Sequence, residues 1–85
     1  MPKSVNTHEY DHFRAQLVTV RQEAGITQVQ LAKRLDKPQS YVSKYERGER
    51  RLDVVEFLQV LEAIGIGSPA DFLDRLRMGP AEEGA

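Results

Sequence analysis

The stretch from Thr27 to Gly48, TQVQLAKRLDKPQSYVSKYERG, decides the fold because it predicts two short helices joined by a tight turn. In the second of these helices, Val42 and Tyr45 are three residues apart and therefore face a core together. The other side of that helix is polar, and amide, hydroxyl and ammonium groups can read base edges in a DNA major groove. The residues on this polar side are Gln39, Ser40, Ser43 and Lys44.

Local signals indicate where both helices begin and end. Thr27 can cap the first one, and Gln30 three residues later completes a capping-box pattern. Residues 36–38 form the turn, where Asp36 takes a position that usually requires a left-handed backbone. The second helix then runs from about Gln39 to Arg47. The inner residues of the first helix are Leu31, Ala32 and Leu35.

One helix precedes this stretch and two follow it. Apolar residues four, seven and eleven positions after Phe13 predict a helix from about Tyr10 to Ala24, which Gly25 ends. Asp53 caps a fourth helix, whose inner side is Phe57, Leu58, Leu61 and Ile64. After Gly65 and Gly67, a fifth helix begins with Ser68 and Pro69 and carries the apolar residues Phe72, Leu73 and Leu76. The sequence therefore predicts an all-α fold of five helices.

Length and composition bound the possible functions. A chain of 85 residues without cysteine predicts one small domain with no disulfide or thiolate metal site. We expect the domain at residues 9–77, with flexible tails at 1–8 and 78–85. No apolar run approaches the roughly 18 residues of a membrane span, and the N-terminus lacks a signal-peptide segment. A soluble, cytoplasmic protein without enzymatic activity, cofactor or resident metal is expected.

Charge is distributed unevenly, although the net charge is only −1. Residues 27–51 contain seven basic and three acidic side chains, a net of +4, and the remainder carries −5. This division indicates one positive face that can hold phosphates. The alternative is an ordinary solvated helix surface of mixed charge.

Two sequence motifs in this region resemble a known family. They are Arg-x-x-x-Gly-Ile-Thr-Gln-x-x-Leu-Ala, from Arg21, and Ser-x-Val-Ser-Lys-x-Glu-Arg-Gly, which ends at Gly48. Together they resemble the lambda-repressor-like, Cro/C1 or XRE-type helix-turn-helix domain, and the resemblance extends from about Phe13 to Leu76. It implies sequence-specific binding of double-stranded DNA as a homodimer, usually to regulate transcription.

The resemblance also implies roles for individual residues. Gln28 matches a glutamine that contacts a DNA phosphate, and Gln39 matches the first base-reading position, where an amide can pair with adenine. Arg21 and Glu46 match an internal salt bridge. Ser40, Ser43 and Lys44 match the remaining groove-facing positions. The expected DNA-backbone contacts are Gln28, Thr27, Tyr41, Arg47, Arg50 and Arg51.

Three features leave alternatives open. Residues 8–12, HEYDH, match the zinc-peptidase pattern, but without a third ligand or room for a cleft we expect an exposed first turn, or at most adventitious metal binding by His8 and His12. Tyr41 is as compatible with burial as with a phosphate contact. The candidate dimer residues Phe72, Leu73 and Leu76 could equally belong to the core.

Two functions from different classes fit the sequence. The first is a homodimeric transcriptional regulator, most simply a repressor or controller, that places its third helix in the major groove of an inverted-repeat operator. The second is a protein-interaction module of the same fold, such as the antitoxin that neutralises a toxin partner.

Overall fold

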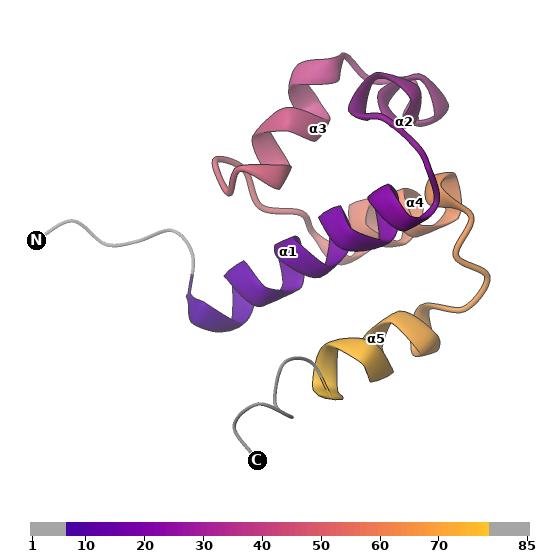
Figure 1. Ribbon diagram of the computed structural model, residues 1–85. Coiled ribbons are helices and arrows are strands. Elements are labelled where there is room, and N and C mark those ends of the chain that lie inside the picture. Colours follow the sequence, from indigo (N-terminus) through magenta and orange to yellow (C-terminus); the bar gives the residue numbers. More distant parts are fainter. Residues whose placement is uncertain (1–6, 79–85) are drawn as a thin grey trace, which may run out of the picture.

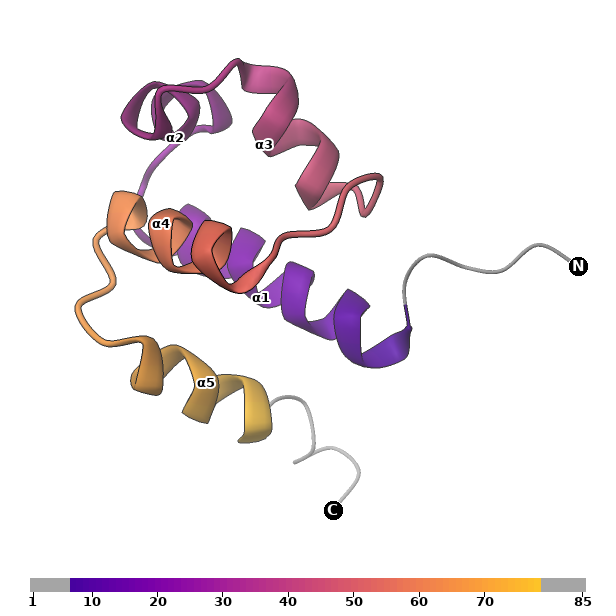
Figure 2. The same cartoon turned by 180° about the vertical axis from the view of Figure 1, so that it is seen from behind.

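A computed structural model describes residues 7–78, and over this range the chain forms five α-helices and no strand (Figure 1). They are α1 (His8–Glu23), α2 (Gln28–Leu35), α3 (Gln39–Glu46), α4 (Val54–Ile64) and α5 (Pro69–Met78). The all-α, five-helix prediction is confirmed. The pair α2 and α3 lies on one side of α1, while α5 lies on the opposite side, as the front and back views agree (Figures 1 and 2).

Helix α1 begins at His8, two residues earlier than its apolar pattern predicts. The Thr7 hydroxyl caps it by accepting a hydrogen bond from the backbone N–H of Tyr10 at 3.0 Å. Acidic side chains in the first turn, Glu9 and Asp11, also suit the positive end of the helix dipole. Most of this turn is polar, so apolar periodicity gives no sign of it. The predicted tails lie outside the described residues, apart from Thr7, His8 and Met78.

Helices α2 and α3 are joined as their turn chemistry predicts. Thr27 and Gln30 form a complete capping box, with both reciprocal hydrogen bonds in place. Asp36 ends α2 in a left-handed conformation at φ 59°, the one positive φ among non-glycine residues of the described chain. Pro38 precedes α3 without a side-chain cap, and α3 ends at Glu46, one residue before the predicted end.

Helix α4 begins with a second capping box, made by Asp53 and Glu56. Its buried side differs from the prediction, because Leu58 is 43% exposed whereas Val60 is completely buried. The predicted stripe was therefore wrong at Leu58. Both residues are apolar, so the pattern of α4 alone does not decide which of them faces α1 and α2.

The core joins all five helices. Its fully buried side chains include Leu17 of α1, Leu31 of α2, Tyr45 of α3, Leu61 of α4 and Phe72 of α5. Three phenylalanine rings from α1, α4 and α5, one within this core and two packed against it, lie with centroids 5.3–6.0 Å apart, a spacing at which tilted and edge-on rings attract. They are Phe13, Phe57 and Phe72. None of the helices between residues 7 and 78 is both long and apolar enough to span a bilayer.

Helix α5 is also tied to α1 by polar contacts. The Arg75 guanidinium pairs with the Glu23 carboxylate at 3.1 Å. His12 Nε2 lies 3.1 Å from the backbone oxygen of Leu76. These contacts fix α5 across the end of the molecule that is remote from α3 (Figure 1).

Candidate nucleic-acid interface

Helix α3 has a fully buried side and an exposed polar side. Val42 and Tyr45 are completely buried in the core. Gln39, Ser40 and Lys44 are exposed, and Ser43 is half-buried. The polar side chains that the sequence analysis assigns to base reading thus share the outward side of one short helix.

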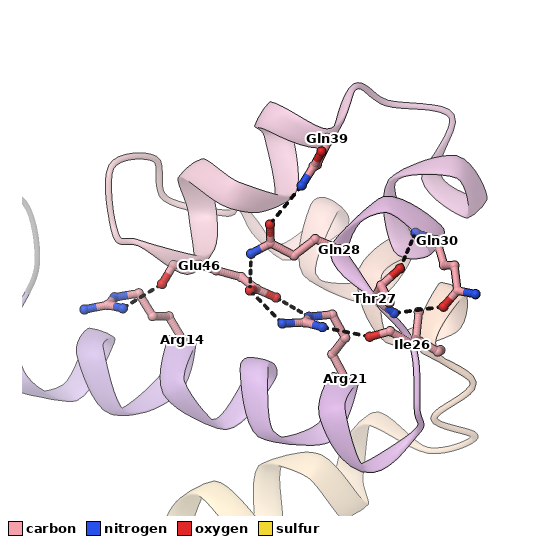
Figure 3. A network of polar contacts seen from close by, with 8 residues as sticks. All are labelled: Arg14, Arg21, Ile26, Thr27, Gln28, Gln30, Gln39 and Glu46. Carbon is pink, nitrogen blue, oxygen red and sulfur yellow. Dashed lines mark hydrogen bonds and ion pairs between the residues drawn. The ribbon is translucent and has the colours of Figure 1, made fainter.

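A buried ion pair fixes α3 against α1 (Figure 3). Arg21 Nε and Nη2 donate to the two Glu46 carboxylate oxygens at 2.6 and 3.1 Å. The two residues are only 9% and 7% exposed, and Arg21 Nη1 also donates to the Ile26 carbonyl at 2.7 Å. Arg14 adds a bond to the Glu46 backbone oxygen at 2.7 Å. A buried charged pair needs such additional hydrogen bonds to offset the loss of its hydration.

The same glutamate orients the two glutamines (Figure 3). Gln28 Nε2 donates to Glu46 Oε1 at 2.8 Å, which turns Gln28 Oε1 toward Gln39. Gln39 Nε2 donates to that oxygen at 3.4 Å, and Gln39 Oε1 points away from Gln28. The predicted phosphate contact and the first predicted base reader are therefore linked side by side. Gln28 and Gln39 belong to different helices, so the sequence alone does not predict this link.

Arg47 is held by its own helix and by the loop that follows. Its Nη1 donates to Ser43 Oγ at 2.6 Å, while Nε and Nη2 donate to the Glu49 carboxylate at 2.9 and 3.1 Å. The hydrogen bond from Arg47 lowers the pKa of Glu49, and the same bond raises the pKa of Arg47. Both side chains are more than half exposed, so this pair is solvated.

Arg50 and Tyr41 belong to a cluster that braces the loop between α3 and α4. Arg50 Nη2 and Nη1 donate to the Glu56 carboxylate at 2.6 and 3.1 Å. The Arg50 guanidinium and the Lys37 ammonium both lie over the Tyr41 ring, 4.7 and 5.3 Å from its centroid. The bond from Arg50 lowers the pKa of Glu56, and burial raises the pKa of Tyr41. Arg50, one of the three predicted backbone arginines, is therefore engaged within the chain.

Arg51 stacks on an aromatic ring of α1. Its guanidinium lies 4.1 Å from the centre of the Tyr10 ring. The Tyr10 hydroxyl in turn accepts a hydrogen bond from the Leu52 backbone N–H at 3.0 Å. Arg51 is exposed at the surface, and this stack supports its aliphatic and guanidinium groups.

An apolar groove of about 400 Å³ lies between α4 and α5, away from α3. Phe13, Leu52, Val54, Phe57, Leu58, Pro69 and Leu73 contribute to its lining. Val54 is 71% exposed and Leu73 is 44% exposed at this groove, whereas Phe72 is buried in the core at 1%. Burial removes Phe72 from the candidate dimer residues, and Leu76 is half-buried against the core.

The HEYDH segment forms the first turn of α1. Within the described range, no group of three or more histidine, cysteine or acidic residues is placed to hold a metal ion. His8 is exposed, and His12 faces the Leu76 carbonyl of α5. His12 therefore has a local partner in the packing of α5 on α1.

Five helices with a tight turn between α2 and α3 are the architecture of the helix-turn-helix proteins, a class of DNA-binding transcriptional regulators. A helix-turn-helix family model matches residues 17–72. A solved XRE-family like protein from Pseudomonas syringae pv. tomato str. DC3000 is 46% identical, with a TM-score of 0.76 over 85% of this chain and 88% of that one. The chain belongs to the XRE-type helix-turn-helix family.

A second solved structure supports the fold. It is a wild-type restriction–modification controller protein, 22% identical, with a TM-score of 0.79 over 86% of this chain and 92% of that chain. Curated protein sequences yielded no match.

Proposed function

We propose that the chain regulates transcription by binding an inverted-repeat DNA operator as a homodimer, with α3 of each copy in a major groove. The main support is the polar side of α3, which faces outward while the buried Arg21–Glu46 pair holds the helix against α1. A short helix that is fixed against the rest of the domain can present side chains to a groove with little loss of conformational freedom on binding. Half-sites would lie about one helical turn, roughly 34 Å, apart.

Different side chains would serve different contacts. Gln39 and Lys44 would read base edges, because an amide pairs with adenine and an ammonium group favours the acceptors of guanine. Gln28 stands at the N-terminus of α2, where backbone N–H groups and the helix dipole attract a phosphate. Arg51, exposed beyond α3, would hold the backbone without reading sequence. The +4 net charge of residues 27–51 supports such a placement.

The apolar groove supports the homodimer. Exposed Val54, Leu58 and Leu73 surround it, and a groove between α4 and α5 leaves α3 uncovered. In a two-fold dimer the same patch serves both copies, so one self-complementary apolar surface is sufficient. A second copy would therefore dock here.

Selection from a random duplex pool, followed by gel-shift titration at stated salt, tests the proposal. The expected outcome is an enriched inverted repeat that binds at least 10³-fold more tightly than unrelated DNA, the usual specificity range. Arg77→Ala is a matched control, since it removes one exposed positive charge from α5, remote from α3. A pool that yields no enriched sequence would refute the proposed function.

A further inference from the structure

We infer that Arg47 and Glu49 are positioning residues that fix the Ser43 hydroxyl as a hydrogen-bond donor toward a base, and that Arg47 is not a phosphate clamp. The inference rests on the proposed function and assigns roles within the same surface. It departs from the sequence analysis, which placed Arg47 among the DNA-backbone contacts.

The Nε–Nη2 edge of the Arg47 guanidinium is already occupied within the chain. Arginine grips a phosphate best through two parallel N–H groups on one edge. In Arg47 the edge formed by Nε and Nη2 is occupied by both oxygens of Glu49, at 2.9 and 3.1 Å. A phosphate at this edge would have to displace a carboxylate and would be repelled by it. Arg47 therefore meets an anion already supplied by its own chain.

The bond from Arg47 restricts where the Ser43 hydroxyl proton can point. A serine hydroxyl has one O–H donor and two acceptor lone pairs. Arg47 Nη1 donates to Ser43 Oγ at 2.6 Å, which occupies one lone pair with a short, charge-assisted bond. A guanidinium cannot accept a hydrogen bond, so the Ser43 proton must point elsewhere. Glu49 holds Arg47 in the geometry that maintains this polarity.

The direction of the Ser43 hydroxyl proton decides which base-edge groups it can bind. An undirected serine hydroxyl can donate or accept, and it discriminates poorly for that reason. With its proton turned away from Arg47, Ser43 would favour base-edge acceptors, which are N7 and O6 of guanine, N7 of adenine and O4 of thymine. A cytosine amino group at the same place could reach only the second lone pair of Ser43 Oγ, beside the positive Arg47 donor. Ser43 would thus read more than its small side chain suggests.

Base-preference profiles of four single variants and one double variant test this inference. Ser43→Ala, Arg47→Ala and Glu49→Gln are each expected to relax preference at the same operator position, by roughly 3- to 10-fold, the range expected for one hydrogen bond. Ser43→Thr keeps the hydroxyl and should retain the preference. Adding Arg47→Ala to Ser43→Ala should relax that position no further, because both changes remove one interaction. All three native residues are at least partly exposed, and thermal unfolding checks that every variant folds.

The salt dependence of binding distinguishes a positioning role of Arg47 from a phosphate contact. The slope of log K against log salt for Arg47→Ala should equal that of the charge-matched Arg77→Ala. The inference is overturned if Arg47→Ala lowers that slope by about 0.9 and weakens all sequences evenly, while Glu49→Gln tightens them evenly, because that is the behaviour of a phosphate contact. Failure of the wild-type chain to select any sequence is a different result, which refutes the proposed function and this inference with it.

Discussion

At the scale of single residues, Lys44 gives the most direct test of which surface meets DNA. It is exposed on α3, one residue before the fully buried Tyr45. Lys44→Ala should weaken binding to the selected operator by about 1–3 kcal/mol and relax the preferred base at one position, since a groove-facing ammonium group is lost. Selection and titration of this variant beside Arg77→Ala measure both effects. An unchanged consensus for Lys44→Ala would show that another surface reads the DNA.

Glu46 tests how the same helix is supported from within. Glu46→Gln keeps the shape of the side chain but leaves the Arg21 guanidinium buried without a counter-charge. Breaking one partner of a buried pair typically costs about 3–5 kcal/mol, so we expect the urea midpoint to fall accordingly. Glu23→Gln is a suitable control, because it breaks the exposed Arg75–Glu23 pair and should cost less than about 1 kcal/mol. Equal losses in the two variants would contradict the structural role of Glu46.

At the scale of elements, the turn between α2 and α3 carries a measurable strain. Asp36 occupies a left-handed conformation at φ 59° and ψ 44°, which glycine adopts without steric cost. Asp36→Gly is expected to stabilise the fold by about 0.5–1 kcal/mol, although the more flexible unfolded chain offsets part of the gain. Asp36→Val should destabilise it, because a β-branched side chain tolerates this region poorly. Chemical denaturation of both variants would settle the order, and greater stability for valine would contradict it.

Helix ends could be predicted from the sequence because their determinants are local. The Thr27–Gln30 capping box and the Asp36 turn each depend on residues only a few positions apart, and each is present in the structure. The choice between Leu58 and Val60 is different in kind. Both are apolar and lie two residues apart on one helix, so packing against α1 and α2 decides which is buried. That information is not contained in the spacing of α4.

The outward polar side of α3 was also predictable, whereas its internal contacts were not. Spacing alone separates Gln39 and Lys44 from the buried Val42. The bonds that join Gln28 to Glu46 and Arg47 to Glu49 depend on side-chain rotamers and on the path of the loop after Gly48. Each of these pairs changes the chemistry of a predicted DNA contact. For that reason, the residues of the candidate site could be predicted from the sequence, but the hydrogen-bond partner of each side chain could not.

At the scale of the whole molecule, the two proposed surfaces are separated. The α2–α3 pair lies on one side of α1 and α5 on the other (Figures 1 and 2). The polar side of α3 and the apolar groove between α4 and α5 can therefore act at the same time. Substitutions in the groove can therefore test self-association, and substitutions on α3 can test DNA binding, independently of each other.

Leu73 tests the proposed homodimer without disturbing the core. It lines the apolar groove and is 44% exposed, so Leu73→Glu should fold normally but place a charge where a second copy would dock. Sedimentation equilibrium is expected to show dimer for the wild-type chain and monomer for the variant at the same concentration. Binding to the inverted repeat should fall at least tenfold, because two unlinked half-site contacts lose their effective concentration. Val29→Glu, at a 48% exposed valine of α2, is the matched control for self-association. A wild-type monomer, or a Leu73→Glu chain that remains dimeric, would place the dimer contact elsewhere or remove it, because the groove would then be covered by something other than a second copy.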